Sequence, residues 1–271
     1  MNRVIVISGG SSGLGKQVRK LFEEESGNIV LSISRNVDES NEREYACDVS
    51  DEKAVEKIFN IIAKKYGKID LLLNNAGFGL SGITELIKPE EAKRLFDVNF
   101  FGAWYCVKSA LPHMPKGGRI VNIGSAMEFF PVPYRAFYAS SKSALDTLSQ
   151  TLRMECKPLG VDVTCVCPGD IKTEFTKNRV KDFETNERYG EAMKKATLKV
   201  DARENKRMSV ESVAKKLFKI CNKKKTKPMY LIGAKYKFIY FLSKFFPLSL
   251  KLKVISKVCW AWGWKPCVFT H

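Results

Sequence analysis

The sequence predicts an α/β fold, a doubly wound and mostly parallel sheet with helices on both faces. Over the first two thirds of the chain, short segments rich in β-branched residues alternate with longer segments of helical periodicity, and the short segments are apolar at consecutive positions. Strands of that kind are buried on both faces, which the crossover helices of parallel βαβ units achieve. Such sheets bind ligands beyond the carboxyl ends of their strands, so we expect the functional residues there.

Five strands and four helices account for the alternation. The strands are expected at Val4–Ser8, Ile29–Ser34, Leu71–Asn74, Arg119–Ile123 and Asp162–Cys167. The helices are expected at Gly15–Glu25, Glu52–Tyr66, Pro89–Leu111 and Ser140–Leu159. Strands that alternate with helices in this way favour parallel βαβ units in one sheet.

The net charge of +17 over 271 residues is concentrated at the carboxyl end. Glu211 is the last acidic residue, and fourteen lysines but no arginine follow it. Residues 1–211 hold 32 basic and 29 acidic side chains, so they are nearly neutral. We therefore predict a domain over 1–211 and a basic, aromatic-rich extension over 212–271 that packs on or beside it. A hydrophobic content of 45% excludes disorder along the whole chain.

The eight cysteines are not spaced like a disulfide framework or a zinc site. Cys165 and Cys167 lie two apart in an apolar segment, so a strand places both on one face, and we expect them to be buried and reduced. Zinc is not expected, because His113 and His271 are the only histidines and no Cys-x-x-Cys occurs. The first residues run directly into a strand, and no segment approaches 18 uncharged apolar residues. We therefore expect a cytoplasmic protein with no signal peptide, transmembrane helix or metal.

A glycine-rich turn, from Ser8 to Gly15, connects the first strand to the first helix. Gly9, Gly13 and Gly15 allow a tight turn and a close approach to a pyrophosphate at the helix N-terminus, where free N–H groups and the helix dipole favour anions. The alternative is an ordinary glycine-rich turn. The position directly between the first strand and a helix favours nucleotide binding.

Arg35 follows the second strand, at the point where dinucleotide-binding folds distinguish NAD from NADP. An acidic residue there bonds the ribose 2′-hydroxyl, whereas a basic residue accommodates a 2′-phosphate. Ser34 is not acidic, and the Arg35 guanidinium can pair with phosphate. We expect Arg35 to favour NADP(H), the alternative being a solvated surface arginine.

Tyr138 and Lys142 lie one helical turn apart, so both project from the same face of a helix. The free pKa of tyrosine is about 10, and an adjacent ammonium group favours the phenolate, which makes proton exchange with a substrate oxygen feasible. Ser125 follows an apolar strand and lies 13 residues before Tyr138. Tyr240 and Lys244 have the same spacing, but no comparable serine precedes them, and we assign them to the basic extension.

These motifs resemble those of the short-chain dehydrogenase/reductase family, over roughly residues 3–175. The glycine turn is similar to the family's T-G-x-x-x-G-x-G, with Ser8 in place of the threonine, which keeps the hydroxyl. Residues 74–77 reproduce N-N-A-G, residues 138–142 the Y-x-x-x-K pair, and residues 168–173 the P-G-x-x-x-T loop. Asp48 and Val49 match the family's D-V pair, and Asn99 matches its helix asparagine.

The resemblance implies a Rossmann-type fold, an NADP(H) cofactor and a set of site residues. The catalytic residues that it implies are Asn99, Ser125, Tyr138 and Lys142. The residues that it implies for cofactor binding are Gly9, Ser11, Ser12, Gly13, Leu14, Gly15, Arg35, Asp48, Val49, Asn75, Ala76, Gly77, Tyr138, Lys142, Pro168, Gly169, Ile171 and Thr173.

The implied reaction is a reversible hydride transfer between NADP(H) and a secondary alcohol or ketone. In reduction, Tyr138 is expected to donate a proton to the carbonyl oxygen, while Ser125 hydrogen-bonds the same oxygen. Lys142 is expected to lower the tyrosine pKa and to hold the nicotinamide ribose. Asn99 is expected to help hold a water near the lysine, which completes the proton path.

The substrate has to be inferred from the variable segments. Residues 127–137 are rich in aromatics, and residues 174–210 form a charged helical insert where the family keeps its mobile substrate lid. Phe129, Phe130 and Phe137 line an apolar pocket in one interpretation and pack against helices or a dimer partner in the other. A bulky apolar substrate is favoured over a sugar, with a hydroxysteroid or bile acid first and a retinoid or lipid ketone as the alternative.

The basic extension suggests two locations for residues 231–264. Lysines recur near helical spacing among apolar and aromatic residues in Leu231–Phe246 and Leu248–Trp264, on either side of Pro247. Such segments suit an anionic membrane surface, with Trp260, Trp262 and Trp264 at headgroup depth. Packing over the substrate cleft or at a dimer contact is the interpretation that we rank ahead of peripheral membrane contact.

Two other classes of function are less favoured. An NADP(H)-sensing regulatory protein on this fold would normally lack the Tyr/Lys pair, which is intact here. A nucleic-acid-binding protein is suggested only by the charge, and the extension has neither arginine nor a recognition motif, so we expect no nucleic-acid partner. The resemblance implies a homodimer or homotetramer formed through the helices that carry Asn99 and Tyr138.

Overall fold

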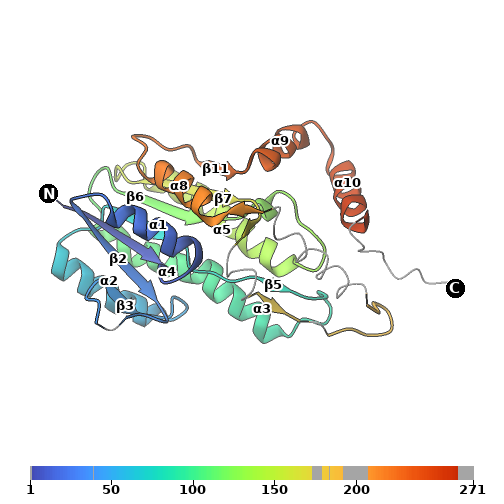
Figure 1. The fold of residues 1–271 in the computed structure, drawn as a ribbon, viewed down its shortest axis with the longest axis horizontal. Helices are drawn as coiled ribbons and strands as arrows, with labels where there is room; N and C mark the ends of the chain where they lie inside the picture. Colours follow the sequence, from blue (N-terminus) through green and yellow to red (C-terminus); the bar gives the residue numbers. More distant parts are fainter. Residues whose placement is uncertain (1, 39, 173–178, 183, 192–206, 262–271) are drawn as a thin grey trace.

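A seven-stranded parallel sheet forms the centre of the molecule, with helices on both faces, as the sequence predicts (Figure 1). The computed structural model describes residues 2–38, 40–172, 179–182, 184–191 and 207–261. The strand order is β11-β7-β6-β4-β1-β2-β3, and every neighbouring pair runs parallel. The order reverses beside β1, and sheets of this kind bind their ligands at that switch point.

The elements have the following bounds. The strands of the main sheet are β1 (Arg3–Ser8), β2 (Asn28–Ser34), β3 (Glu44–Ala46), β4 (Leu71–Asn74), β6 (Arg119–Ile123), β7 (Asp162–Pro168) and β11 (Met229–Ile232). Two short parallel pairs join β5 (Leu80–Ser81) to β9 (Val180–Lys181) and β8 (Ile171–Lys172) to β10 (Met208–Ser209). The helices are α1 (Gly13–Glu23), α2 (Glu52–Tyr66), α3 (Pro89–Phe96), η1 (Asp97–Phe101), α4 (Gly102–Ala110), η2 (Leu111–His113), η3 (Ala126–Glu128), α5 (Ala136–Glu155), α8 (Val210–Cys221), α9 (Ala234–Ser243) and α10 (Leu248–Ala261).

The strands predicted from the sequence are confirmed, each to within one residue, and two short edge strands are added. β3 and β11 have three and four residues, too few to show a clear period. The basic segment predicted from Leu231 begins too early, because Leu231 and Ile232 are buried in β11. The predicted helix Ser140–Leu159 begins instead at Ala136, so α5 includes both Tyr138 and Lys142.

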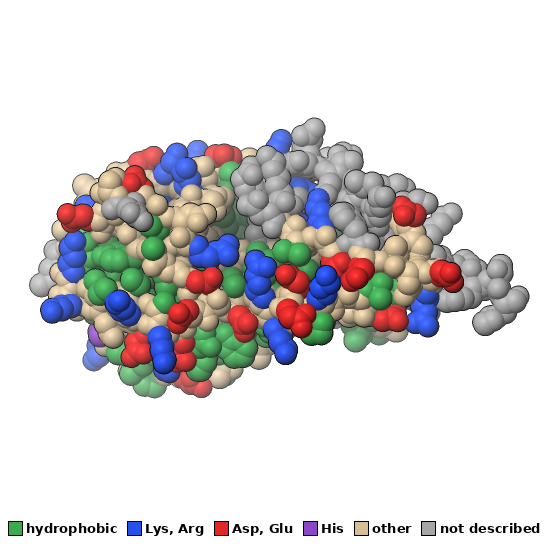
Figure 2. Space-filling model, turned by 90° about the horizontal axis from the view of Figure 1, so that it is seen from below, with side chains coloured by type: hydrophobic (Ala, Val, Ile, Leu, Met, Phe, Trp, Pro, Cys, Tyr) green, Lys and Arg blue, Asp and Glu red, His purple; other side chains and the backbone are tan. Residues whose placement is uncertain are grey.

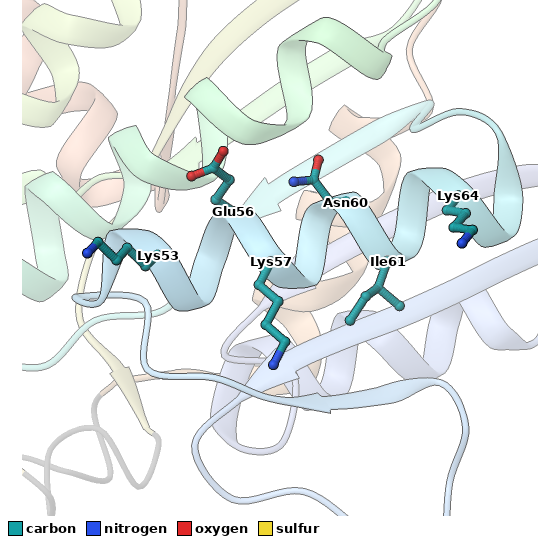
Figure 3. Close-up of a pocket in the computed structure, with 6 residues that line it drawn as sticks. All are labelled: Lys53, Glu56, Lys57, Asn60, Ile61 and Lys64. Atoms are coloured by element: carbon teal, nitrogen blue, oxygen red, sulfur yellow. The ribbon is translucent and has the colours of Figure 1, made fainter.

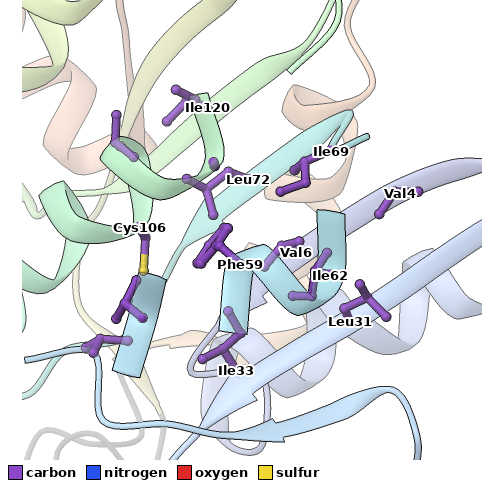
Figure 4. Packing of buried hydrophobic residues seen from close by; sticks show 14 of the residues in the cluster. Val4, Val6, Leu31, Ile33, Phe59, Ile62, Ile69, Leu72, Cys106 and Ile120 are labelled. Atoms are coloured by element: carbon purple, nitrogen blue, oxygen red, sulfur yellow. The ribbon is translucent and has the colours of Figure 1, made fainter. Parts of the chain in front are cut away.

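Side chains alternate along each strand between two apolar cores. Val4 and Val6 of β1 contribute to the core beneath α2, α4 and α5, whereas Ile5 and Ile7 face α1 and α8. Figure 4 shows the first of these cores, in which Phe59 of α2 lies against the strands. Burial of one such side chain contributes about 1.5–3 kcal/mol, so both cores hold the helices tightly on the sheet.

The predicted helix Pro89–Leu111 is one helical path with a π-helical turn inside it. α3, the π turn η1 and α4 follow one another directly. The π turn carries Asn99, whose side chain is buried. Turns of this type are rare and are frequently found at functional sites.

The basic extension divides into a buried and a projecting part. α8 packs against α1 with Val213 and Leu217 in the core, and β11 completes the sheet beside β7. α9 and α10 lie at one end of the body (Figure 1), and α9 contains no buried residue. Trp262 and Trp264 lie outside the described residues, as does the side chain of Trp260. Among the described residues, no helix has the length and apolar character needed to cross a membrane.

The body carries both signs of charge on its surface. Figure 2 shows one face on which basic and acidic side chains are interspersed rather than gathered. This distribution agrees with the near balance of charge over residues 1–211. The excess of lysines therefore belongs to the end of the chain.

Candidate active site

The glycine turn between β1 and α1 is held by close packing. Gly9 and Gly13 have φ of +69° and +52°, in the left-handed region that favours glycine. A Cβ at Gly15 would overlap the carbonyl oxygen of Gly9, so only glycine lets α1 begin this close to the turn. The residues of the predicted glycine motif therefore serve the geometry that was expected of them.

Ser8 joins the glycine turn to the segment after β4. Its hydroxyl oxygen accepts hydrogen bonds of 3.1 Å from the backbone N–H groups of Asn75 and Ala76. In return, Asn75 Nδ2 donates to the carbonyl oxygens of Ser8, at 3.2 Å, and Gly9, at 3.0 Å. The hydroxyl that the sequence keeps at this position thus brings the N-N-A-G segment against the turn.

The N-terminus of α1 is suited to an anion. Ser12 makes no side-chain capping hydrogen bond, and the first turn contains no acidic residue. The first N–H groups of a helix lack partners within it and, with the helix dipole, attract phosphate. Ser11 donates its backbone N–H to the Ser34 hydroxyl, at 3.3 Å, while Leu14 is buried in the core below.

Arg35 is exposed directly after β2, on the same side of the sheet as the glycine turn. Asp48 is near it. Burial opposes ionisation of the Asp48 carboxyl, but hydrogen bonds from Ser50 and the charge of Arg35 lower its pKa overall. The Ser50 N–H and hydroxyl donate to Asp48 Oδ1 at 3.0 and 2.7 Å. Val49 is buried against Gly102 of α4.

Ser125, Tyr138 and Lys142 meet beyond the carboxyl end of β6. The phenol of Tyr138 is hydrogen-bonded to the Ser125 side chain. Lys142 donates from Nζ to the carbonyl oxygen of Ile123, at 2.8 Å. Ser125 and Lys142 are 8% and 4% exposed, so both lie in a desolvated setting.

The protonation of this pair differs from the sequence expectation. Burial raises the pKa of Tyr138, and its hydrogen bond with Ser125 and the charge of Arg179 only partly oppose that rise. Burial also lowers the pKa of Lys142. Desolvation therefore outweighs the serine hydrogen bond and the neighbouring positive charges, and the net effect on the pKa of Tyr138 is a rise rather than the expected lowering.

Asn99 closes the site from the π turn. Its side chain exchanges hydrogen bonds with the backbone of Phe78 and donates to the Ser141 hydroxyl at 3.3 Å. A Cβ at Gly77 would lie 2.9 Å from Asn99 Oδ1 and 3.5 Å from Lys142 Nζ. The absence of a side chain at Gly77 therefore lets the asparagine and the lysine approach the same point.

The loop after β7 is described only in part. Pro168 ends β7, and the Gly169 N–H donates to Ile232 at 3.0 Å. A Cβ at Gly169 would overlap the ring of Tyr236, so α9 packs directly on this loop. Ile171 lies in β8, and the predicted Thr173 lies outside the described residues, as does most of the predicted lid 174–210.

Two charged residues at the site are absent from the sequence prediction. Arg179, which precedes β9, lies close enough to Tyr138 for its charge to lower the tyrosine pKa. Glu128 lies in η3, three residues after Ser125, and its carboxylate accepts the Ser125 N–H at 2.5 Å. Glu128 follows no family motif, but its spacing from Ser125 is that of a helix capping box, which was the available signal.

The aromatic residues after Ser125 divide between two apolar clusters. Phe129 packs with Tyr240, with ring centroids 4.7 Å apart, over Cys165 and Cys167. Phe137 and Tyr138 pack with Leu80, Ile87 and Val180 in another cluster. The candidate tyrosine therefore packs against an apolar cluster. A shallow surface depression along α2, lined from Lys53 to Lys64, lies apart from these residues (Figure 3).

The family model of the short chain dehydrogenase matches residues 3–184, more than half of the chain. The 3-ketodihydrosphingosine reductase of Bacteroides thetaiotaomicron is 38% identical over 181 residues, 65% of this chain and 67% of that protein. The probable short-chain type dehydrogenase/reductase VdlC of Helicobacter pylori is 31% identical over 259 residues, 90% of this chain and 93% of that protein.

Solved structures agree in fold. A short-chain dehydrogenase from Streptomyces avermitilis aligns over 95% of this chain and 97% of its own, with a TM-score of 0.79 and 23% identity. ElxO with NADP bound aligns over 88% of this chain and 99% of its own, with a TM-score of 0.72 and 29% identity. With the sheet order, the site geometry and the family match in agreement, the chain belongs to the short chain dehydrogenase family and is an oxidoreductase that acts on CH–OH groups.

Proposed function

We propose that this chain is an NADP(H)-dependent reductase that interconverts a ketone and a secondary alcohol on a bulky apolar substrate. The observation that carries the proposal is the convergence of Ser125, Tyr138, Lys142 and Asn99 beside the glycine turn. These four side chains come from the segment after β6, from η1 and from α5, and they meet only in the fold. They supply an acid, a hydrogen-bond donor and a buried cation within one site.

Tyr138 acts as the acid in reduction. Its raised pKa keeps the phenol protonated near neutral pH, ready to donate its proton to the substrate carbonyl oxygen. Ser125 hydrogen-bonds the same oxygen and stabilises the negative charge that develops there. Lys142 and Asn99 complete the path by which Tyr138 recovers a proton. When bound, the nicotinamide supplies the hydride, and carbonyl, hydride and proton together give the alcohol.

The glycine turn and the uncapped start of α1 fit the pyrophosphate of a dinucleotide. Arg35, exposed at the end of β2, supports a 2′-phosphate and so NADP(H). ElxO, at 29% identity, has been solved with NADP. We keep NADP(H) as the preferred cofactor on these grounds.

A long-chain lipid ketone is the substrate that we favour. Leu80, Ile87, Phe137 and Val180 form an apolar cluster around Tyr138, which suits an apolar substrate. The relative from Bacteroides thetaiotaomicron is named for its action on a 3-ketosphingoid lipid. This moves the lipid ketone ahead of the hydroxysteroid or bile acid, which we keep as the second candidate.

The test is consumption of NADPH or NADH with 3-ketosphingoid, steroid, bile-acid and retinoid carbonyls. We expect NADPH oxidation with a long-chain ketone, and a loss on the order of 10²–10⁴ in kcat for Tyr138→Phe with NADPH binding retained. Tyr240→Phe, which alters the second tyrosine with the same lysine spacing, is the matched control and is expected to keep its activity. Turnover with none of the carbonyls, or equal turnover in wild type and Tyr138→Phe, would contradict the proposal.

We also propose that the enzyme works at an anionic membrane surface, through α9 and α10. Large apolar side chains are exposed along both helices and in the turn between them, among them Phe238 at 64%, Phe245 at 70% and Leu248 at 69%. Lysines lie between them, and no acidic residue follows Glu211. Such a surface gains from burial in the headgroup region and from attraction to anionic lipids.

The same helices adjoin the candidate site. Tyr236 of α9 packs on Gly169, and its hydroxyl donates to Asp170 at 2.8 Å. Tyr240 packs on Phe129. A lipid that leaves the bilayer along α9 would therefore arrive beside the loop that follows β7.

Vesicle flotation tests the membrane proposal. We expect binding to vesicles that contain phosphatidylserine, weaker binding at high salt, and loss of binding in Phe238→Glu/Phe245→Glu. The matched control is Met154→Glu, which changes a 69% exposed apolar residue on α5. Absence of binding at low salt, or equal loss in the control, would contradict it; a concentration-dependent dimer through α9 would favour packing between copies instead.

The homo-oligomer stays a proposal. Phe101 and Trp104, on the π turn and α4, are 37% and 38% exposed and offer aromatic surface to a second copy. Sedimentation of wild type and Trp104→Glu tests it, and a monomer in the wild type would contradict it.

A further inference from the structure

Glu128 lies behind the candidate catalytic residues, where its carboxyl group makes two specific contacts. Oε1 accepts the backbone N–H of Ser125 at 2.5 Å, and Oε2 accepts the Cys167 thiol at 3.2 Å. The Ser125 hydroxyl oxygen in turn accepts the Met127 N–H at 3.2 Å. These bonds form a reciprocal cap on the short helix η3, so the carboxyl group fixes the backbone of Ser125.

The chain leaves room for this carboxyl group at Gly124. A Cβ at Gly124 would overlap Glu128 Oε1 and lie 2.8 Å from the Cys165 sulfur. Cys165 and Cys167 are fully buried on one face of β7, with sulfurs 3.7 Å apart, as expected for adjacent positions on that face. The Glu128 carboxyl group therefore lies between Gly124, which follows β6, and the two cysteines of β7.

Charged and titratable groups face Glu128 from α5 and β7. Lys142 and Asp146 face it from α5, Cys165 and Cys167 from β7, and Tyr138 from the start of α5. Burial raises the pKa of Glu128 to about 8, against the hydrogen bonds from Ser125 and Cys167 and the charge of Lys142. The carboxyl group therefore gains its charge just above neutral pH.

We propose that Glu128 is a positioning residue, which holds Ser125 in place and, through its own charge, controls how readily Tyr138 gives up its proton. The inference rests on the proposed function, in which Ser125 and Tyr138 meet the substrate oxygen. The anionic form of Glu128 disfavours the Tyr138 phenolate, whereas the neutral form does not. Ionisation of Glu128 thus keeps Tyr138 protonated, and competent for reduction, to higher pH.

Four of these side chains could also hold a metal ion, because one potential ligand atom of each lies within 4.8 Å of the others. They are Glu128, Asp146, Cys165 and Cys167. We assign the cluster to tuning rather than to a metal because the Lys142 side chain is buried beside it, where its ammonium form would repel a cation. A thiophilic divalent ion would displace the thiol protons and the bond from Cys167 to Glu128. Metal binding is therefore an outcome of the test that would overturn the proposal.

Glu128→Gln and Glu128→Ala separate the effect of the hydrogen bond to Ser125 from the effect of the carboxylate charge. The amide of Glu128→Gln still accepts the Ser125 N–H and stays neutral, so kcat at pH 6.5 is expected to remain within about threefold of wild type. Because the neutral amide does not disfavour the Tyr138 phenolate, Tyr138 should lose its proton at lower pH. The decrease in the rate of ketone reduction at high pH is therefore expected about one pH unit lower than in wild type. Glu128→Ala loses the bond to Ser125, and its kcat is expected to fall on the order of 10–100-fold, with an unchanged KM for NADPH.

The second readout needs no substrate. Ultraviolet absorbance of tyrosinate, taken as the difference from Tyr138→Phe, follows the titration of Tyr138 with and without NADP⁺. We expect this titration at lower pH in Glu128→Gln than in wild type. Glu155→Gln, which removes a carboxyl group from the exposed far end of α5, is the control and is expected to keep the kcat and the tyrosinate titration of wild type.

The outcomes are distinct. Turnover with no carbonyl would refute the proposed function, while the tyrosinate titration would still test the inference. Superimposed titrations of wild type and Glu128→Gln, wild-type kcat in Glu128→Ala, or an equal loss of kcat in Glu155→Gln would overturn the inference. Stoichiometric zinc in the purified protein, lost in Cys167→Ser, would overturn it in favour of a metal site.

Discussion

Asn99 and Phe78 exchange two hydrogen bonds of 3.0 Å each, from the Phe78 N–H to Asn99 Oδ1 and from Asn99 Nδ2 to the Phe78 carbonyl oxygen. The bonds join the π turn to the loop after Gly77, and they form only because the side-chain amide both donates and accepts. Asn99 is 1% exposed, so neither partner can turn to water instead.

Asn99→Asp tests this pair. The carboxylate keeps the acceptor for Phe78 but places an oxygen against its carbonyl oxygen, which leaves a buried acceptor without a donor. We expect a loss of roughly 1–3 kcal/mol in the free energy of unfolding, measured by urea denaturation. Asn60→Asp, on the exposed face of α2, is the control, and equal small losses in both variants would argue against the pair.

Ser8 provides the second test, because its hydroxyl accepts two backbone N–H groups at once. Ser8→Ala leaves the N–H groups of Asn75 and Ala76 without that acceptor, and each is expected to cost roughly 1–3 kcal/mol of stability. Binding of NADPH, measured by fluorescence titration, is expected to weaken with it. Ser8→Thr keeps the hydroxyl and is expected to bind NADPH like wild type; a Thr variant as weak as the Ala variant would argue against the hydrogen bonds.

Arg35→Asp tests the cofactor preference. The change places a negative charge where the 2′-phosphate of NADP(H) is expected, so the KM for NADPH should rise roughly tenfold or more while that for NADH does not. Arg43→Asp, another exposed arginine near the second and third strands, is the control for the loss of positive charge. An unchanged ratio of the two KM values in Arg35→Asp would refute the assigned role.

Gly169→Ala tests the packing of α9, through Tyr236, against the loop after β7. The added methyl group would overlap the ring of Tyr236, so α9 is expected to detach and its amides to exchange hydrogen faster. The double variant Gly169→Ala/Tyr236→Ala removes the clash and is expected to restore much of the protection relative to Tyr236→Ala alone. Additive effects of the two changes would show that the contact does not matter.

Thiol chemistry provides a test of burial. Burial and the charges of Asp48 and Asp51 raise the pKa of Cys47 to about 11, and burial raises that of Cys221 to about 12. Because both pKa values lie far above pH 8, almost no thiolate is present there, and labelling by a maleimide should occur only after unfolding. Mass-spectrometric mapping checks this, and rapid labelling of Cys47 or Cys221 in the native protein would contradict it.

The strands, the main helices and the order of the site residues follow from local patterns in the sequence. Apolar segments such as Leu71–Asn74 are short and bounded by turns, and the Tyr138–Lys142 spacing equals one helical turn, so each is visible without tertiary contacts. β11 is not visible in this way. Its four residues are apolar and lie between Pro228 and Gly233, but they are too few to show a period, and they become a strand because β7 offers an open edge.

Protonation at the site was also beyond the sequence. The adjacent lysine suggested a lowered tyrosine pKa, yet desolvation depends on how many side chains from other elements cover the phenol. Glu128 shows the same limit, since its neighbours Asp146 and Cys167 are 18 and 39 positions away along the chain.

The sequence by itself determined the fold class, the family and the candidate residues for the chemistry, because periodicity and short motifs are local properties of a chain. Only the tertiary structure decided which charges face one another, which carboxyl group lies behind Ser125, and which apolar side chains of α9 and α10 stay exposed. Those properties depend on packing between elements far apart in sequence, and burial, not residue type, sets the free energy of a charge or an apolar surface.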